Sequence, residues 1–224
     1  MDVQIVRCQI VSLTILSLVY ITQSTYGFKM RKICKDSIEI LSSQGVRIEP
    51  YHKSHVKLAL VELPDTSDNS EFRLSFDFRT MSPDGVLFYG KSKNPRELIA
   101  LILSGGDLIY KIQCPTLHAD ILLPTRNNSR LNDGSWHRIA YSIKYRPYDT
   151  KGHIEIDGFS SIKRYIVSCA PMTTLIMGGH SEEDRGNIAN LENLPGHFEG
   201  CIRNVYVPVP LRYPPKYYAV SVCD

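Results

Sequence analysis

The chain has 224 residues, 43% of them hydrophobic and 22% charged, and its formal net charge is +3 at pH 7. These values are those of an ordinary globular protein, with room for one large β-domain or two small domains around a buried core. The slight positive charge excludes a broad nucleic-acid-binding face, which needs a denser basic surface, but it allows a local basic patch that meets a polyanion.

The first residues are expected to be a cleaved secretory signal and not part of the fold. Arg7 precedes a short apolar run from Ile10 to Ile21, and small and polar residues follow as far as Gly27. Because the run is shorter than the roughly 20 residues that span a bilayer, a signal over residues 1–27 is favoured over a membrane anchor. Cleavage after Ser24 fits as well. No other stretch is apolar enough to span, so a soluble, secreted, extracellular product is expected.

Short strands separated by turns account for most of the remaining chain. The clearest is 72–79, where Phe72, Leu74, Phe76 and Phe78 alternate with polar residues. The apolar run 98–103 would also suit a short helix, but the Gly105-Gly106 turn that follows favours a hairpin. The expected strands, in chain order, are 56–63, 72–79, 86–89, 98–103, 108–112, 119–123, 139–145, 153–157, 175–177 and 197–207.

No segment shows helical periodicity, and neither an internal repeat nor a linker divides the chain. Many short strands with regular turn signals predict a β-sandwich or barrel. We therefore expect one all-β domain from about residue 36 to the end. The tail carries prolines between Pro208 and Pro215, so it is expected to be extended or irregular.

The stretch from Leu131 to Ile139 reads L-N-D-G-S-W-H-R-I and holds the only tryptophan, Trp136. Asn-Asp-Gly is turn chemistry, because these residues accept positive φ. The turn should deliver the aromatic residue onto a half-buried strand. On that strand one face should carry Ile139, Tyr141, Ile143 and Tyr145, and the other Arg138, Ser142 and Lys144.

This string resembles the L-N-D-G-x-W-H-x-V segment of laminin G-like domains. Five segments resemble that family in the family's order: 72–80, 83–90, 98–101 with the Gly105-Gly106 turn, 131–137, and 178–179 followed by 196–205. The resemblance implies a laminin G-like jelly-roll sandwich of two antiparallel sheets, a single domain over residues 28–224.

Secretion makes disulfides the default state of the cysteines. Cys8 leaves with the signal, no spacing suits a structural zinc site, and five cysteines remain: Cys34, Cys114, Cys169, Cys201 and Cys223. The resemblance implies a Cys201–Cys223 bond. Cys114 and Cys169 form a second candidate pair, although other pairings stay open. The odd count leaves one thiol free or bonded to another chain.

The resemblance also implies a calcium ion at the rim of the sandwich, as in many members of the family. Its acidic ligand corresponds to Glu97, and the second position falls near Gly179, with 182–184 a little beyond. Gly179 offers only a carbonyl, whereas calcium takes 6–8 oxygen ligands. The alternative to a calcium site at Glu97 is therefore a degenerate rim with solvated carboxylates.

Basic residues gather in loops, where they would bind the sulfate and carboxylate groups of glycans by charge-assisted hydrogen bonds. The candidate glycan-binding residues are Lys91, Lys93, Arg96, Arg126 and Arg130. The first three are preferred because they adjoin the rim. The alternative is that all five side chains only face solvent in their loops and bind nothing. Asn127 begins an N-glycosylation sequon, and a sugar there would shield Arg126 and Arg130.

No catalytic constellation is evident, so an enzyme is not expected. Asp133, Ser135 and His137 should splay to different faces of a strand, and no nucleophile elbow is present. We expect a secreted binding module that recognises matrix or cell-surface glycans or proteins through its rim loops. One alternative is a carrier of a small apolar ligand, as in sex-hormone-binding globulin, which a cavity in the sandwich would favour. The other is a structural subunit of a disulfide-linked matrix assembly.

Overall fold

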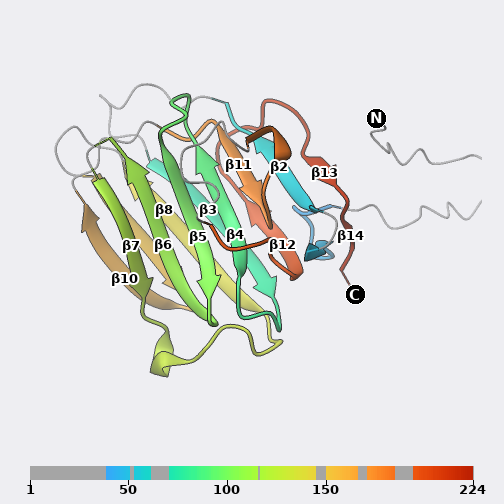
Figure 1. The fold of residues 1–224 in the computed structure, drawn as a ribbon, viewed down its shortest axis with the longest axis horizontal. Helices are drawn as coiled ribbons and strands as arrows, with labels where there is room; N and C mark the ends of the chain where they lie inside the picture. The colour runs from blue at the N-terminus through green and yellow to red at the C-terminus, as the bar shows by residue number, and fades with distance from the viewer. Residues whose placement is uncertain are drawn as a thin grey trace, which may run out of the picture. The chain divides into compact units, whose positions relative to one another are not determined.

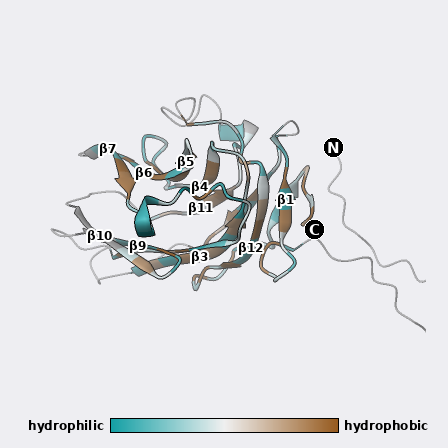
Figure 2. Cartoon of the chain, turned by 90° about the horizontal axis from the view of Figure 1, so that it is seen from below, coloured by the Kyte–Doolittle hydropathy of each residue, from teal (hydrophilic) through white to brown (hydrophobic). Residues whose placement is uncertain are grey.

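The computed structural model describes residues 39–50, 53–61, 71–115, 117–144, 150–165, 171–184 and 194–223. All of them belong to one compact unit, which begins at Ile38. The expected signal, 1–27, lies outside the described residues. Within the described unit two seven-stranded antiparallel sheets face each other, and helix is limited to short 3-10 turns. Figure 1 shows this arrangement, and Figure 2 shows the two layers edge-on. The predicted all-β sandwich is confirmed.

The order of the strands in each sheet departs from their order along the chain. The first sheet contains β10 (Phe159–Tyr165), β9 (Thr150–Ile156), β8 (His137–Lys144), β3 (Glu71–Arg79), β12 (Gly200–Tyr206), β1 (Val46–Ile48) and β14 (Ser221–Val222). The second contains β13 (Lys216–Tyr218), β2 (His55–Ala59), β11 (Thr174–Met177), β4 (Gly85–Lys91), β5 (Leu98–Ser104), β6 (Asp107–Cys114) and β7 (Leu117–Leu123). Two 3-10 turns are described, Arg126–Asn128 and Glu182–Asp184. None of the described segments forms a helix long and apolar enough to cross a membrane.

Aromatic side chains fill the space between the sheets. The alternation predicted for 72–79 is confirmed, because Phe72, Leu74, Phe76 and Phe78 of β3 are all buried. Phe76 meets Phe88 of the opposite sheet edge-on, with ring centroids 6.1 Å apart. Such rings bury much apolar area and prefer this tilted packing.

Strand β5 is apolar from Leu98 to Leu103 because both of its faces are buried there. Ile99, Leu101 and Leu103 belong to the core between the sheets. Leu98, Ala100 and Ile102 belong to a second apolar cluster, together with Val86, Tyr89, Ile176 and Leu194. The two-sided burial explains why the sequence alone could not separate a strand from a short helix here.

The C-terminal tail is more regular than the sequence suggests. It supplies β13, which pairs with β2, and β14, which pairs with β1. A Cys201–Cys223 disulfide, with Cα atoms 5.7 Å apart, ties the residue after β14 to β12. This is the pair that the resemblance implies, and closing a loop of this length contributes about 3 kcal/mol. Cys114 is also disulfide-bonded, but Cys34 and Cys169 lie outside the described residues.

His55 is a buried ionisable side chain on β2, one strand in from the edge of the second sheet. It is 4% exposed, and its ring stacks on Tyr218 of β13 with centroids 4.3 Å apart. Its Nδ1 lies 3.0 Å from the Lys53 carbonyl oxygen, whereas Nε2 has no hydrogen-bond partner among the described residues. Burial lowers the pKa of His55, against a smaller raising effect of the bond to Lys53, because an imidazolium would lose its hydration here.

The free energy of unfolding should therefore fall as the pH drops below about 6.5, where unfolded His55 binds a proton that the folded state resists. A base with a lowered folded-state pKa stabilises the protein at neutral pH and loses that contribution on acidification. His55→Phe keeps a ring against Tyr218 and removes the titration. Urea unfolding at about pH 7.5 and about pH 5.5 should show a smaller difference for this variant than for the wild type. An equal difference in both would contradict the role of His55.

Candidate functional site

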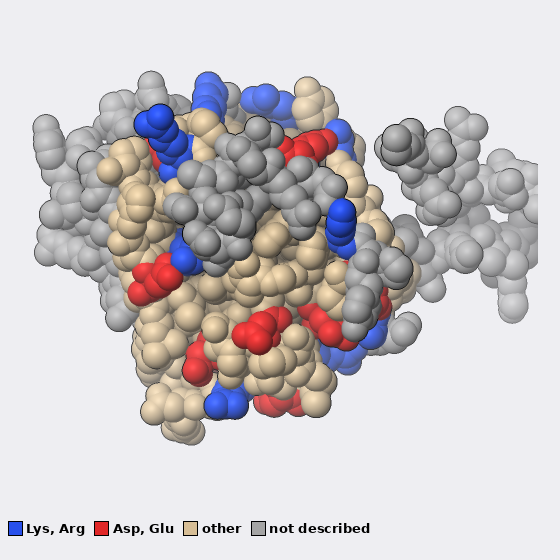
Figure 3. Space-filling model, in the orientation of Figure 1, with Lys and Arg blue, Asp and Glu red and all other residues tan. Residues whose placement is uncertain are grey.

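The five predicted glycan-binding residues fall at opposite ends of the second sheet. Lys91 ends β4, and the loop carrying Lys93 and Arg96 leads from it into β5; we call this the Lys91 end. Arg126 and Arg130 follow β7, where the Leu131 N–H donates to the Gly106 carbonyl at 2.9 Å. We call this second region the Gly85 end, because Gly85 pairs with Leu103 there. Figure 3 shows basic side chains along the upper edge of the molecule, where β4 ends and β5 begins.

At the Lys91 end, a buried carboxylate is neutralised from within the protein. Asp184 is 2% exposed. The Tyr89 hydroxyl donates to its Oδ2 at 2.8 Å, and the Lys91 ammonium donates to its Oδ1. The Tyr89 oxygen in turn accepts the Ser181 N–H at 3.1 Å. Burial raises the pKa of Tyr89, so the phenol stays protonated and remains a donor. We call these four residues the Asp184 cluster.

Glu97, the calcium candidate, is the anchor of its own loop. It is buried, its Oε2 accepts the Ser92 hydroxyl at 2.8 Å and its Oε1 accepts the Asn94 amide at 3.1 Å. Asn94 also accepts the Arg96 N–H through its side-chain oxygen at 3.1 Å. These bonds fix the short loop between β4 and β5.

The acidic residues at this end are already engaged by protein donors. Both oxygens of Glu97 and both oxygens of Asp184 already accept hydrogen bonds from protein donors. Lys91 supplies the positive charge that Asp184 needs, and an ammonium beside a carboxylate repels a second cation. Across the ranges that the structure describes, no three His, Cys, Asp or Glu side chains converge into a metal site. The expectation of calcium at Glu97 therefore finds no support in the donor set.

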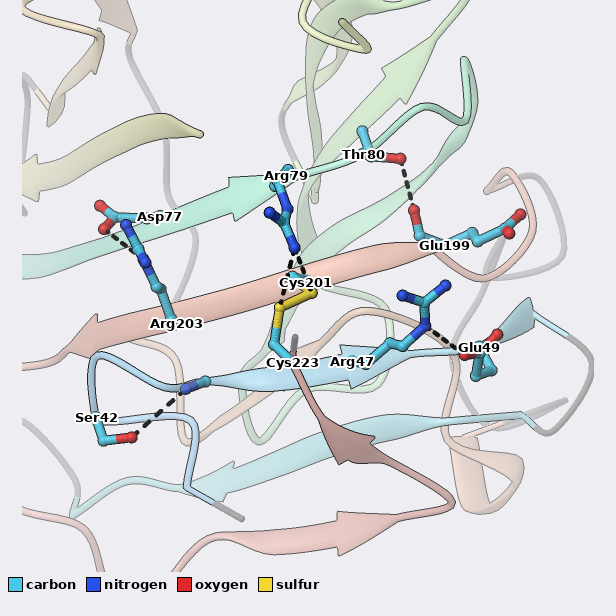
Figure 4. Close-up of a disulfide and its surroundings, with 11 residues drawn as sticks. Ser42, Arg47, Glu49, Asp77, Arg79, Thr80, Glu199, Cys201, Arg203 and Cys223 are labelled. Carbon is cyan, nitrogen blue, oxygen red and sulfur yellow. Dashed lines mark hydrogen bonds and ion pairs between the residues drawn. A yellow bond between two sulfur atoms is a disulfide. The ribbon is translucent and has the colours of Figure 1, made fainter. Parts of the chain in front are cut away.

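A stack of charged and aromatic side chains covers the outer face of the first sheet at the Gly85 end. Trp136 is half-buried there, with the guanidinium of Arg203 3.8 Å and that of Arg79 5.0 Å from its ring centroid. Asp77 accepts the Asn204 amide at 2.6 Å and lies 3.4 Å from Arg203 Nε. Figure 4 shows Arg79 pointing from β3 toward the disulfide and Arg203 further along β12, beside Asp77. The sequence reading did not assign Trp136 a role, although its place two residues before Arg138 puts it on that face.

The turn before β8 brings together two residues that were expected to splay apart. His137 Nε2 lies 3.1 Å from Asp133 Oδ1, so the prediction of separate faces is wrong for this pair. His137 Nδ1 lies 2.8 Å from Asp157 Oδ2. Ser135 contacts Asp133 through its backbone N–H at 2.7 Å. Carboxylates therefore contact both ring nitrogens of His137, and these contacts connect the turn before β8 to Asp157 after β9. Neither ring nitrogen is left to act as a base for a nucleophile.

An apolar groove opens at the edge of the sandwich beneath the tail. It has a volume of about 380 Å³, and its lining includes Leu41, Leu58 of β2, Val205 of β12 and the tail 207–211. Because β2 and β12 belong to different sheets, the groove reaches between them from the side.

Comparisons with known proteins agree with this architecture. The family model described as Laminin G domain matches residues 78–208. A laminin subunit alpha of Drosophila melanogaster is 24% identical over 162 residues, which cover 67% of this chain and 4% of that protein. Sex hormone-binding globulin of Rattus norvegicus is 30% identical over 147 residues, covering 63% of this chain and 33% of the relative.

Among solved structures, domains LG4-5 of the mouse laminin alpha1 chain share the fold with a TM-score of 0.60 and 19% identity. The match covers 84% of this chain and 49% of that chain. The chain therefore spans only part of the length of each of these proteins.

Removing the ammonium of the Asp184 cluster should destabilise the fold. Lys91→Met keeps the aliphatic stem but leaves Asp184 buried without its cation, which should lower the free energy of unfolding by about 3 kcal/mol. Lys93→Met, an exposed neighbour, is the matched control and should change it by less than about 0.5 kcal/mol. The double variant Lys91→Met with Asp184→Asn should recover part of the loss. Equal stability of Lys91→Met and wild type would contradict the pairing.

Proposed function

Because the chain belongs to the laminin G domain family, we propose that it is a secreted extracellular module that binds anionic glycans of the matrix or cell surface, or the proteins that carry them. In a rigid sandwich the loops at the strand ends are free to set specificity. The proposal therefore rests on which loops present charged side chains in a fixed geometry, and not on the fold alone.

The loop between Lys91 and Leu98 is the observation that carries the proposal. Lys93 and Arg96 are exposed on it, while Glu97 and Asn94 hold its backbone through the bonds described above. A loop fixed before binding loses little conformational entropy when a ligand arrives. Lys91 is engaged by Asp184, so its role in binding is to position the loop, and Lys93 and Arg96 make the ligand contacts.

Arg126 and Arg130 form a separate patch at the Gly85 end. Asn127 lies between them in the exposed 3-10 turn, with φ of 60°. Glycosylation of Asn127, which we also propose, would cover this patch and leave the Lys91 end open. The two basic groups are thus not parts of one binding surface.

Heparin chromatography tests the proposal. Retention beyond physiological salt is expected for the wild type, with and without a calcium chelator. The double variant Lys93→Ala, Arg96→Ala should elute at clearly lower salt. Each lost contact to a sulfate group removes part of the electrostatic affinity for heparin. Arg126→Ala with Arg130→Ala removes the same charge at the other end and serves as the control. Equal shifts in the two double variants, or no retention of the wild type, would contradict the proposal.

The apolar groove supports a second candidate function, the carriage of a small apolar ligand. Its volume of about 380 Å³ lies in the range of small-molecule sites. Leu41 is partly exposed on its wall. A fluorescent steroid probe should bind the wild type and lose affinity at least tenfold in Leu41→Arg. Leu122→Arg, at an exposed leucine of β7, should have no effect. Absence of saturable probe binding to the wild type would remove this candidate.

A further inference from the structure

Two cavities share Tyr206, the last residue of β12, as a wall. One is the apolar groove beneath the tail, of about 380 Å³, which Tyr206 lines together with Leu41, Leu58, Val205 and 207–211. The other, of about 370 Å³, lies on the outer face of the first sheet, where Tyr206 lines it together with residues of β3, β8 and β9. Tyr206 is 62% exposed, so its side chain stands at the border of both cavities.

The groove suits an apolar chain. Each residue that lines it is apolar or aromatic, and none carries a charge. Leu58 is fully buried, whereas Leu41 is 39% exposed, so the lining extends from the core to the surface. An apolar chain that entered the groove would leave water, and the gain in free energy would grow with the area that it buries.

The cavity on the sheet face combines short side chains with charged ones. Ser75 of β3 is paired with Tyr206 on one side and with Ala140 of β8 on the other, and the short side chains of Ser75 and Ala140 leave space above the strands. Apart from tyrosines, the ionisable side chains that line the cavity are Glu71, Arg73, Arg138 and His153. Two guanidinium groups against one carboxylate leave an excess of positive charge, which favours a ligand with one negative charge.

Arg73 is the guanidinium next to Tyr206. The pKa of Arg73 is raised chiefly by the hydrogen bond and charge of Glu71 and to a smaller degree by Tyr206, so the guanidinium lies within electrostatic range of the phenol. The bond from Arg73 to Glu71 is 3.0 Å long, and the two side chains are 65% and 33% exposed. Exposed ion pairs contribute little to stability, and a guanidinium has five donors. Arg73 can therefore share its donors with an anionic ligand.

We propose that the two cavities form one site for a free amphiphile with a single anionic head, a long-chain carboxylate. The apolar chain lies in the groove, the Tyr206 ring packs against the carbons next to the head, and Arg73 pairs with the carboxylate by charge-assisted hydrogen bonds. This inference rests on the second candidate function, the carriage of an apolar ligand, and adds to it a preference for an anionic end. It is independent of the loop that carries Lys93 and Arg96.

Titration of the full chain with cis-parinaric acid, a fluorescent long-chain carboxylate, tests the proposal. A saturable rise in emission is expected, and the methyl ester of the same probe should bind at least fivefold more weakly. Arg73→Gln should weaken binding of the acid at least fivefold and leave binding of the ester unchanged, which a merely structural role of Arg73 would not do. Arg130→Gln, at an exposed arginine after β7, removes the same charge elsewhere and should change neither affinity.

Leu41→Arg closes the apolar part of the site and should weaken binding of the acid and of the ester at least tenfold. Equal affinity of the wild type for acid and ester, or no saturable binding of either while the steroid probe binds, would overturn this inference and leave the carrier function standing. Failure of all three probes would overturn both.

Sedimentation with vesicles of phosphatidylcholine and phosphatidylserine distinguishes a free ligand from a membrane surface. The protein should stay in the supernatant. Sedimentation that Leu41→Arg abolishes would assign the site to a lipid surface and overturn the proposal of a free ligand.

Discussion

The register of β3 against its two neighbours is the constraint on which both the core and the outer face depend. Phe78 lies opposite His137 of β8 and Ile202 of β12, so the even-numbered side chains of β3 all enter the space between the sheets. The same register places Asp77 and Arg79 on the outside, beside Arg138 and Cys201. A slip of one residue would bury these charges and expose the phenylalanines. The aromatic core thereby also fixes the position of the arginine–tryptophan stack.

Buried carboxylates at the Lys91 end are compensated by the protein itself, and this determines what the loop there can do. An ionised Asp184 in the interior is tolerated only with a partner cation and hydrogen bonds, which Lys91 and Tyr89 supply. Glu97 is satisfied in the same way by its own loop. Asp184 and Glu97 are consequently used for architecture, while Lys93 and Arg96 face solvent.

Short-range signals in the sequence predicted most of the strands and the sandwich, and short motifs carried the resemblance to the family, because each of those signals lies within a few neighbouring residues. The strands β13 and β14 of the tail were not expected. The contacts that define the sites join residues that are distant in the sequence. Lys91 and Asp184 are far apart in the chain, and nothing local to either indicates the other. The separation of Arg130 from Arg96 depends on where β5, β6 and β7 turn. Trp136 is the exception, since its parity with Arg138 was sufficient to place it on the outer face, although the sequence analysis did not use it.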